Sequence, residues 1–427
     1  MSLLKHDKLH LAPDATRTVI RPFDPQYPQA FADTEPSRTE RIVDTILAMD
    51  EDQLGSDQEA VIAPLQKRHR ALDALLLRRY DEIAAIVPAA KGASDAAKLV
   101  IGAYFSEEYS FEAAALFNPS MVIHPDDEDV GDGNVRFLLS LRGIGEGHIS
   151  SVTFRTGHWT KEAGFSIDPV SNQAVSPRIE DADVAGDGVT RIMCEGSRDP
   201  SESVLFPVTP SQRQGIEDLR MCRFVEDDGK VDYLGTYTAF DGRDARSEML
   251  RGVGISDFEM RELTGSAAAA KGMALFPRRV DGQYVMLGRQ DNENIWLLRS
   301  DDLYTWEGGE KLIEPKFSWD LCQMGNCGSP IEIAEGWLVI THGVGLVRNY
   351  AMGAALLDKD DPSKVLARTP EPILRPSPKE RDGYVPNVVY SCGAMVHGRT
   401  LLLPYGIADN FAAFASGSVD ELLGVMN

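Results

Sequence analysis

Short apolar strands separated by polar turns recur along most of this chain. Five units begin with the runs FNPSMVI (from Phe117), GIEDLRMCRF (from Gly215), KGMALFP (from Lys271), CGSPIEI (from Cys327) and SCGAMV (from Ser391). After a polar turn, each continues into a second apolar run: FLLSLRG, YLGTYTAF, YVMLGRQ, WLVITHG and LLLPYGIAD. Short strands that recur roughly every 50 to 60 residues are typical of a β-propeller, because a single four-stranded blade cannot bury both of its faces. The pattern therefore predicts a mainly β fold of repeated units.

A polar residue stands at a comparable place in each unit. These residues are Arg142, Asp218, Arg289, His342 and Asp409. In a propeller the innermost strands surround a central channel, so equivalent positions converge even when they are far apart in sequence. Taken alone, any one of these residues is explained equally well as an ordinary polar group at the end of a strand. All five together favour one shared site.

The first part of the chain has a different pattern. From about residue 37 to 110, apolar residues recur at helical spacing in RIVDTILAM and RALDALLLRRYDEIAAIV. A break at residues 91–94 precedes a further predicted helix through AAKLVIGAYFSEEYSFEAAALF, which leads directly into the strand at Phe117. We predict an N-terminal segment and helical region over residues 1–110 and a β-propeller over residues 111–427. We also expect a strand near the N-terminus to complete the last blade.

Charge and composition narrow the class of partner. The chain has 427 residues, of which 43% are hydrophobic and 26% charged, with a formal net charge of -23. A nucleic-acid partner is not expected, because binding the phosphate backbone normally needs a basic surface. A local basic pocket for a small anion remains compatible with this charge.

The N-terminus and the cysteines indicate the compartment. The first residues lack the continuous apolar core of a signal peptide, and no window is long and apolar enough to span a bilayer, so we expect a cytoplasmic protein. The cysteines are predicted to be buried free thiols in a reducing compartment, without spacing suited to a metal site. They are Cys194, Cys222, Cys322, Cys327 and Cys392.

The motif with the clearest chemistry is GIEDLR, where Glu217 and Asp218 precede Arg220 at the entrance to an apolar strand. A carboxylic acid held there can donate a proton. On this motif and on FNPS, KGMALFP with the later LGR, GWLVITHGV, GAALLDKDDPSKVLARTPEPIL and YGIAD, the chain resembles glycoside hydrolase family 130 from Phe117 to about Ala415. That family comprises mannoside phosphorylases and related β-mannoside-cleaving enzymes.

The resemblance implies a five-bladed propeller and an inverting glycoside phosphorylase, a glycosyltransferase-type activity. Such an enzyme cleaves a β-mannoside, of manno-oligosaccharide or mannosyl-glucose type, to mannose 1-phosphate. Inorganic phosphate would be the co-substrate, with no other cofactor and no metal. The partners would be a small oligosaccharide and phosphate, with neither nucleic acid nor membrane, and a homo-oligomer stays open.

The resemblance also implies roles for individual residues. Asp218 matches the proton donor. The positions that match phosphate-binding residues are Lys271, Arg289, His342 and Tyr350, with Arg142 nearby. The positions that match sugar-binding residues are Asn118, Ser120, Arg220, Gln323 and Asp409. Leu219 replaces the usual proline, Gly272 a polar residue and Gln323 a lysine, which leaves the identity of the sugar open.

Residue chemistry favours phosphorolysis over hydrolysis. An inverting hydrolase needs two carboxyl groups, one as acid and one to activate water. A phosphorylase needs the acid and a set of cations, because phosphate is itself the nucleophile. Two alternatives remain: a hydrolase on the same scaffold, for which Glu146, Asp291 and Glu293 are candidates, and a non-catalytic glycan-binding propeller.

Overall fold

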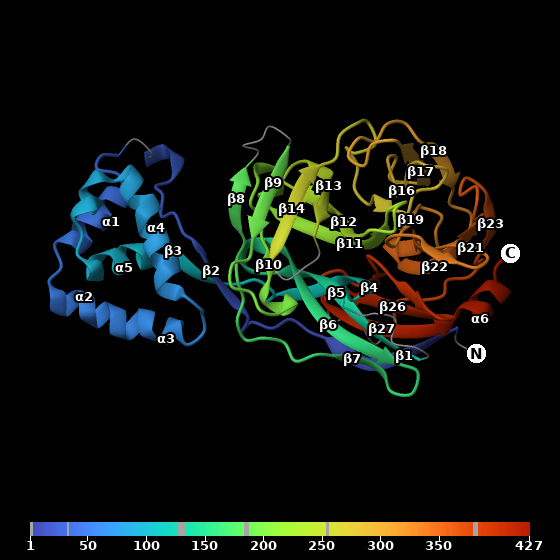
Figure 1. Ribbon diagram of the computed structural model, residues 1–427, viewed down its shortest axis with the longest axis horizontal. Coiled ribbons are helices and arrows are strands. Elements are labelled where there is room, and N and C mark those ends of the chain that lie inside the picture. The colour runs from blue at the N-terminus through green and yellow to red at the C-terminus, as the bar shows by residue number, and fades with distance from the viewer. Residues whose placement is uncertain (1–2, 32–33, 127–132, 183–187, 253–255, 379–382) are drawn as a thin grey trace. The chain divides into compact units, whose positions relative to one another are not determined.

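The computed structural model describes residues 3–31, 34–126, 133–182, 188–252, 256–378 and 383–427 (Figure 1). The chain is mostly β, and it separates into two compact units. One unit, called here the helical unit, comprises residues 16–110 and 172–176. The other, the β unit, comprises residues 1–15, 111–171 and 177–427.

The helical unit contains five α-helices and a two-stranded sheet. Its elements are β2 (Thr18–Pro22), η1 (Gln29–Phe31), α1 (Arg38–Leu47), α2 (Glu51–Asp57), η2 (Gln58–Ile62), α3 (Ala63–Gln66), α4 (Leu72–Ile86), η3 (Pro88–Gly92), α5 (Asp95–Tyr104) and β3 (Ser106–Ser110). The start of α1 is fixed by a capping box, in which the Ser37 hydroxyl accepts from the Glu40 N–H and the Glu40 carboxylate accepts from the Ser37 N–H. Buried residues such as Val43, Ile46 and Ile101 form the core between the helices.

The long helix predicted after residue 94 is wrong in its second half. Helix α5 ends at Tyr104, and the next residues form β3, which pairs with β2. Val19 and Tyr109 face each other in this pair and are buried. The alternation of buried and accessible positions suits a strand, and the pairing with a distant segment is not visible in the local pattern.

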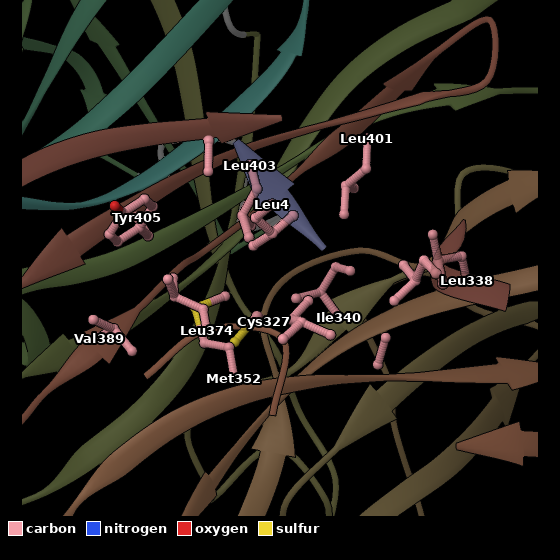
Figure 2. Close-up of a cluster of buried hydrophobic side chains, with 14 of the residues drawn as sticks. Leu4, Cys327, Leu338, Ile340, Met352, Leu374, Val389, Leu401, Leu403 and Tyr405 are labelled. Atoms are coloured by element: carbon pink, nitrogen blue, oxygen red, sulfur yellow. The ribbon is translucent and has the colours of Figure 1, made fainter. Parts of the chain in front are cut away.

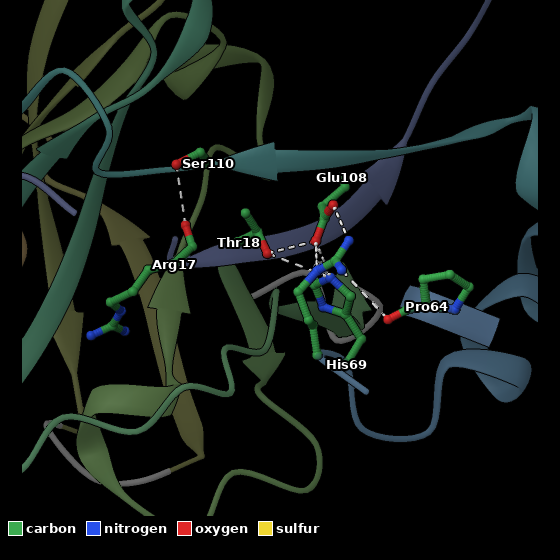
Figure 3. Close-up of polar contacts among 7 residues, drawn as sticks. Arg17, Thr18, Pro64, His69, Glu108 and Ser110 are labelled. Carbon is green, nitrogen blue, oxygen red and sulfur yellow. Dashed lines mark hydrogen bonds and ion pairs between the residues drawn. The ribbon is translucent and has the colours of Figure 1, made fainter. Parts of the chain in front are cut away.

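Glu108 joins this small sheet to the turn between α3 and α4. Its carboxylate accepts hydrogen bonds from Thr18 Oγ1 (2.9 Å), Arg68 Nη2 (2.8 Å) and, when the ring is protonated there, His69 Nε2 (2.8 Å) (Figure 3). The hydrogen bond from Arg68 is the largest influence that lowers the pKa of Glu108, to about 2. All these groups have partners, so we interpret the cluster as structural.

In the described residues of the β unit, the strands form four sheets. Their orders are β1-β27-β26-β24 with β25 on β26, β4-β5-β6-β11-β12-β13-β14-β9-β8 with β7 and β10 on β6, β15-β16-β17-β18, and β19-β21-β22-β23 with β20 on β21. The first half of the strands are β1 (Leu4–Leu11), β4 (Ala115–Ile123), β5 (Asn134–Ile144), β6 (Ser150–Thr160), β7 (Gly164–Ile167), β8 (Arg178–Ala182), β9 (Val189–Met193), β10 (Val204–Leu205), β11 (Gly215–Val225), β12 (Val231–Phe240), β13 (Ala245–Arg251) and β14 (Asp257–Glu262).

The remaining elements of the β unit run to the C-terminus. They are β15 (Ala274–Leu275), β16 (Tyr284–Gly288), β17 (Ile295–Ser300), β18 (Glu310–Ile313), β19 (Gln323–Asn326), β20 (Ile331–Ile333), β21 (Gly336–Val344), β22 (Tyr350–Leu357), β23 (Val365–Arg368), β24 (Val389–Tyr390), β25 (Met395–His397), β26 (Thr400–Ile407), β27 (Phe411–Ser418) and α6 (Val419–Gly424). Short helical turns η4 (Glu146–His148), η5 (Pro200–Glu202), η6 (Pro210–Gln212) and η7 (Leu346–Arg348) connect some of them.

The strand pairs predicted from the apolar pattern are confirmed. We call the first apolar run of each unit its entrance run. Each of the five entrance runs contributes a strand that pairs antiparallel with the second run of its unit: β4 with β5, β11 with β12, β15 with β16, β20 with β21, and β25 with β26. Two of the entrance runs are also hydrogen-bonded to each other. The Met121 N–H donates to the Gly393 carbonyl at 3.2 Å, which joins the first entrance to the last.

The expected N-terminal strand is also found. Strand β1 pairs with β27, so the two ends of the chain meet in one sheet (Figure 1). Leu4 of β1 is 4% exposed and belongs to a buried cluster with Leu401, Leu403 and Ile340 (Figure 2). The first strand thus contributes to the core of the last sheet.

Four of the cysteines are buried free thiols, as predicted, and Cys322 is an exposed free thiol. Within the described ranges, we find no helix whose length and apolar character would let it cross a membrane.

Replacement of Leu4 should test how far β1 stabilises the last sheet. We expect Leu4→Ala to lower the free energy of unfolding by about 2 to 4 kcal/mol, because a buried leucine is replaced by a cavity. All five tryptophans lie between Trp159 and Trp337, so the fluorescence change in urea reports on the β unit. Leu366→Ala, at a side chain that is 50% exposed, is the control. Equal effects of the two changes would show that β1 does not stabilise this sheet.

Candidate active site

A cavity of about 190 Å³ in the β unit brings together most of the predicted site residues. It is lined by Asn118, Arg142, Asp218, Arg220, Thr238, Lys271, Gly272, Arg289, Arg348, Tyr350, Val385, Val388, Tyr390 and Asp409. These residues come from all five repeated units, although they are spread over much of the sequence.

The cavity is basic in an acidic protein. Five of its lining residues are Lys or Arg and two are Asp, whereas the whole chain carries a formal net charge of -23. Among the described residues, Lys271 and Arg348 have no hydrogen-bond or ion-pair partner, and Arg289 Nε is buried without a partner. Lys271 and Arg348 are exposed and Arg289 is half-buried, so their donors at the cavity are suited to charge-assisted hydrogen bonds with an anionic ligand.

Two β-bulges place polar side chains at the cavity. The register of β4 with β5 shifts between Phe117 and Ser120, and that of β11 with β12 shifts between Glu217 and Arg220. Asn118 and Asp218, inside these bulges, have positive φ values of 47° and 54°. A non-glycine residue in this region is held there by its surroundings, and such positions are concentrated at functional sites.

Asp218 is surrounded by donors and cations. Its Oδ1 accepts a hydrogen bond from Asn118 Nδ2 at 2.8 Å and lies 3.4 Å from Arg142 Nη1. Burial by itself would raise the pKa of Asp218, but Arg142, Asn118, Arg220 and Lys271 together hold this pKa below its usual value. With these groups around it, Asp218 is a carboxylate near neutral pH.

The pKa of Asp409 is displaced in the opposite direction, upward. Asp409 follows β26 at a φ of 52°, and burial together with the negative charge of Asp218 raises its pKa to about 6. Arg142 and Arg348 act against this rise. Two carboxyl groups in one cavity thus have pKa values displaced in opposite directions, which is a frequent property of acid–base sites.

His342 lies behind Arg289 and not at the cavity surface. It is 0% exposed, and its Nε2 lies 3.1 Å from Arg289 Nη1. Burial, followed by the charges of Arg289 and Arg220, lowers the pKa of His342 well below its usual value. A neutral ring with an unprotonated Nε2 can accept the hydrogen bond of the guanidinium, so His342 is placed to orient Arg289.

Arg220 lines the cavity but is held by protein groups. Its Nη1 donates to Asn326 and its Nη2 donates to the hydroxyl of Tyr390. Asn326 Nδ2 in turn donates to the carbonyl of Gly272 at 2.9 Å. These contacts link four of the repeated units around the cavity.

Two predicted sugar-binding residues are not among the lining residues. Ser120 is fully buried, and its Oγ accepts from the Met221 N–H at 3.0 Å. Gln323 lies on β19 opposite Val344. Eight of the eleven predicted site residues line the cavity, and His342 is joined to it through Arg289.

Three polar lining residues, Thr238, Arg348 and Tyr390, were missed by the sequence analysis, as were the apolar Val385 and Val388. Arg348 stands two residues before the predicted Tyr350, and Tyr390 directly precedes the last entrance run. The closeness of Arg348 and Tyr390 to these motifs could have identified them as candidates. Thr238 has no comparable signal in the sequence.

The carboxylates considered for a hydrolase do not line the cavity. Asp291 accepts hydrogen bonds from the N–H groups of Glu293 and Asn294, which belongs to a local turn. Glu146 and Glu293 are likewise absent from the lining. Across the described part of the chain, no group of three or more His, Cys, Asp or Glu side chains is arranged to hold a metal ion.

Fold and site together define a mainly β protein with a basic, carboxylate-containing cavity. A family model described as beta-1,4-mannooligosaccharide phosphorylase matches residues 195–427. The chain therefore belongs to glycoside hydrolase family 130.

Individual relatives agree with this assignment. The chain is 37% identical over 217 residues to a 1,2-beta-oligomannan phosphorylase of Thermoanaerobacter sp. (strain X514), covering 50% of this chain and 71% of the relative. It is 35% identical over 229 residues to a beta-1,2-mannobiose phosphorylase of Listeria innocua, covering 51% and 62%. The solved structure of a Listeria innocua beta-1,2-mannobiose phosphorylase with beta-1,2-mannobiose covers 74% of this chain and 92% of its own, at 25% identity and a TM-score of 0.51.

The raised pKa of Asp409 predicts a pH-dependent stability. The folded-state pKa of about 6 exceeds the value of ~3.9 for an unfolded aspartate, so the stability supplied by the neutral acid is present below about pH 4 and is lost as pH rises through 6. We expect Asp409→Asn to raise the free energy of unfolding at pH 8 by on the order of 2 to 3 kcal/mol, with no gain near pH 4.

Urea unfolding at both pH values measures this difference. Asp281→Asn is a matched control, because Asp281 is exposed and has a similar φ of 51°. If Asp409→Asn gave the same change at pH 4 and pH 8, the pKa of Asp409 would not be raised in the folded protein.

Proposed function

We propose that this chain is an inverting β-mannoside phosphorylase that uses the basic cavity to hold inorganic phosphate and Asp218 as the proton donor. A phosphate oxygen attacks the anomeric carbon of the mannosyl group while the bond from that carbon to the glycosidic oxygen breaks. The proton of Asp218 passes to that oxygen, directly or through a hydroxyl of the bound sugar. The products are α-mannose 1-phosphate and the shortened saccharide.

The observation that carries this proposal is the excess of cations around Asp218, because five Lys or Arg residues and two Asp residues line the cavity. Lys271, Arg289 and Arg348 have donors available for a ligand, whereas Arg142 and Arg220 are bound to protein groups. A guanidinium offers paired donors to phosphate and an ammonium a concentrated charge. A hydrolase would instead need a second carboxylate with room for water, and its sequence candidates lie outside the lining.

Phosphate binding would also favour the protonated form of Asp218, which is the form that can donate a proton. The cations of the cavity lower the pKa of Asp218. A bound phosphate anion near Lys271 and Arg289 would offset those charges, so the pKa of Asp218 would rise and protonation would become easier. Binding of the nucleophile and protonation of the acid are then coupled.

The roles proposed for the other residues are those implied by the family resemblance. We assign phosphate binding to Lys271, Arg289 and Tyr350, with a contribution from Arg142, all of which line the cavity. Asn118 and Asp409, at the bulge and after β26, are assigned to the transferred sugar. His342 supports phosphate binding through Arg289.

We also propose that the β unit is a five-bladed propeller and that residues 1–110 and 111–427 are the two domains of the chain, with β1 exchanged into the last blade. The five confirmed strand pairs and the pairing of β1 with β27 support this arrangement. A crystal structure with another number of blades would overturn it.

The proposed activity is tested by incubating the protein with β-1,2- and β-1,4-mannobiose, with and without phosphate. We expect mannose 1-phosphate only when phosphate is present, and Asp218→Asn should reduce its formation by ~10² to 10⁴-fold, the usual contribution of general acid catalysis. Circular dichroism of the variant checks the fold. Release of free mannose at an unchanged rate without phosphate would establish the hydrolase alternative, and binding without turnover the non-catalytic one.

The indirect role of His342 gives a separate prediction. Arg289→Ala should raise the KM for phosphate about tenfold or more and leave the KM for mannobiose nearly unchanged, because a charged hydrogen bond is worth ~1.5 to 3 kcal/mol. His342→Ala should raise the KM for phosphate less, since the guanidinium remains.

The double variant separates the two roles. If His342 acts only through Arg289, the double variant should resemble Arg289→Ala alone, because the two changes remove one interaction. Multiplicative effects on the KM for phosphate would show that His342 contacts phosphate independently.

A further inference from the structure

Tyr390 of β24 lies in the middle of a chain of contacts that joins two cations of the cavity. Its hydroxyl accepts a hydrogen bond from Arg220 Nη2 at 2.5 Å. Its ring meets the ring of His342 edge-on, with centroids 4.9 Å apart and planes at 63°. His342 Nε2 in turn lies 3.1 Å from Arg289 Nη1. Tyr390 is half-buried and lines the cavity, so it can contact a ligand directly.

The contact with Arg220 fixes the role of the Tyr390 hydroxyl. A guanidinium can only donate, so the phenol oxygen is the acceptor and the phenol proton must point elsewhere. Among the residues that the structure describes, this hydroxyl has no other hydrogen-bond partner. Burial raises the pKa of Tyr390 although Arg220 acts against this rise, so the hydroxyl keeps its proton near neutral pH. Tyr390 therefore presents a donor that can bind an acceptor atom of a ligand.

This donor is held in place at both ends of the residue. Arg220 Nη1 donates to the main-chain and side-chain oxygens of Asn326, which anchors the guanidinium that contacts the phenol. The backbone of Tyr390 pairs with Gly406 of β26. A donor that is oriented before the ligand arrives loses little conformational entropy on binding. The charge of Arg220 also polarises the hydroxyl, which strengthens it as a donor.

The surroundings of the hydroxyl favour an anionic acceptor. A Cβ on Gly272 would lie 3.6 Å from Arg220 Nη2, the nitrogen that donates to Tyr390, so the segment that carries Lys271 passes beside this pair. Within the described ranges, neither Arg220 nor Tyr390 has a carboxylate as a hydrogen-bond partner. The donor thus stands among cations whose charge no carboxylate contacts directly.

We propose that Tyr390 is a further phosphate-binding residue, whose hydroxyl donates a hydrogen bond to an oxygen of inorganic phosphate. This inference rests on the proposed function and deepens it, because it adds a neutral donor to Lys271 and Arg289. A neutral donor orients the nucleophile without adding to the positive charge that lowers the pKa of Asp218.

Tyr390→Phe tests this role, since it keeps the ring that packs on His342 and removes only the hydroxyl. With the full-length protein, mannobiose and phosphate, we expect the KM for phosphate to rise about tenfold, the usual effect of losing a hydrogen bond to a charged group. The KM for mannobiose should stay nearly unchanged. An unchanged KM for phosphate would overturn the proposal, as would an equal rise in both KM values, which indicates a purely structural role.

Tyr405→Phe is the matched control. Tyr405 is a buried tyrosine of β26 whose hydroxyl lies 2.9 Å from His6 Nδ1, and it is not among the lining residues. This change should leave both KM values as they are. If circular dichroism shows that Tyr390→Phe does not fold, a crystal structure of the unaltered protein grown with phosphate decides. A phosphate oxygen within hydrogen-bond distance of the Tyr390 hydroxyl would support the proposal, and a structure without this contact would overturn it.

Failure of the proposed function gives a different result. In that case the unaltered protein would form no mannose 1-phosphate from mannobiose and phosphate. Calorimetric titration of inorganic phosphate into the unaltered protein and into Tyr390→Phe then tests the phosphate contact alone. Binding about tenfold weaker in Tyr390→Phe would support the contact. Equal affinities, or no binding to the unaltered protein, would refute it.

Discussion

The organisation of the cavity depends on the buried contact between Arg142 and the acidic pair of β11. Arg142 Nη2 donates to Glu217 Oε1 at 2.7 Å, and its Nη1 lies 3.4 Å from Asp218 Oδ1. Its Nε donates to Ser150 Oγ at 2.9 Å, so the guanidinium joins β5, β6 and β11. Removing a charge from water is costly unless it is paired, and the charge of Arg142 contributes to the lowered pKa of Asp218.

In the proposed function, the cations of the cavity serve two purposes that oppose each other. Cations attract phosphate, but they also keep the pKa of Asp218 low, whereas a proton donor must be protonated. The conflict is resolved if the anion arrives before the acid acts, because the anion offsets the cationic field. The lowered pKa of His342 keeps its ring neutral. His342 can therefore orient Arg289 without adding another positive charge near Asp218.

Local features of the sequence predicted much of the β unit. The alternation of apolar runs and polar turns identified five pairs of strands, because a strand and its hairpin partner are encoded by adjacent residues. The prediction of a helix beyond Tyr104 was wrong because the structure there depends on residues that are distant in sequence. Residues 106–110 form a strand because β2 offers them hydrogen-bond partners, and β2 is remote in sequence. A local pattern cannot report such a partner.

The sequence by itself determined which residue types are available for the chemistry: an acidic pair in GIEDLR, cations at the ends of strands, and repeated units that bring these positions together. Only the tertiary structure decided their surroundings. It buried His342 behind Arg289, bound Arg220 to Asn326 and Tyr390, and placed Arg348 in the cavity lining. The physical reason is that pKa values, hydrogen-bond partners and exposure depend on neighbours contributed by other strands, and those neighbours are defined only when the sheets pack.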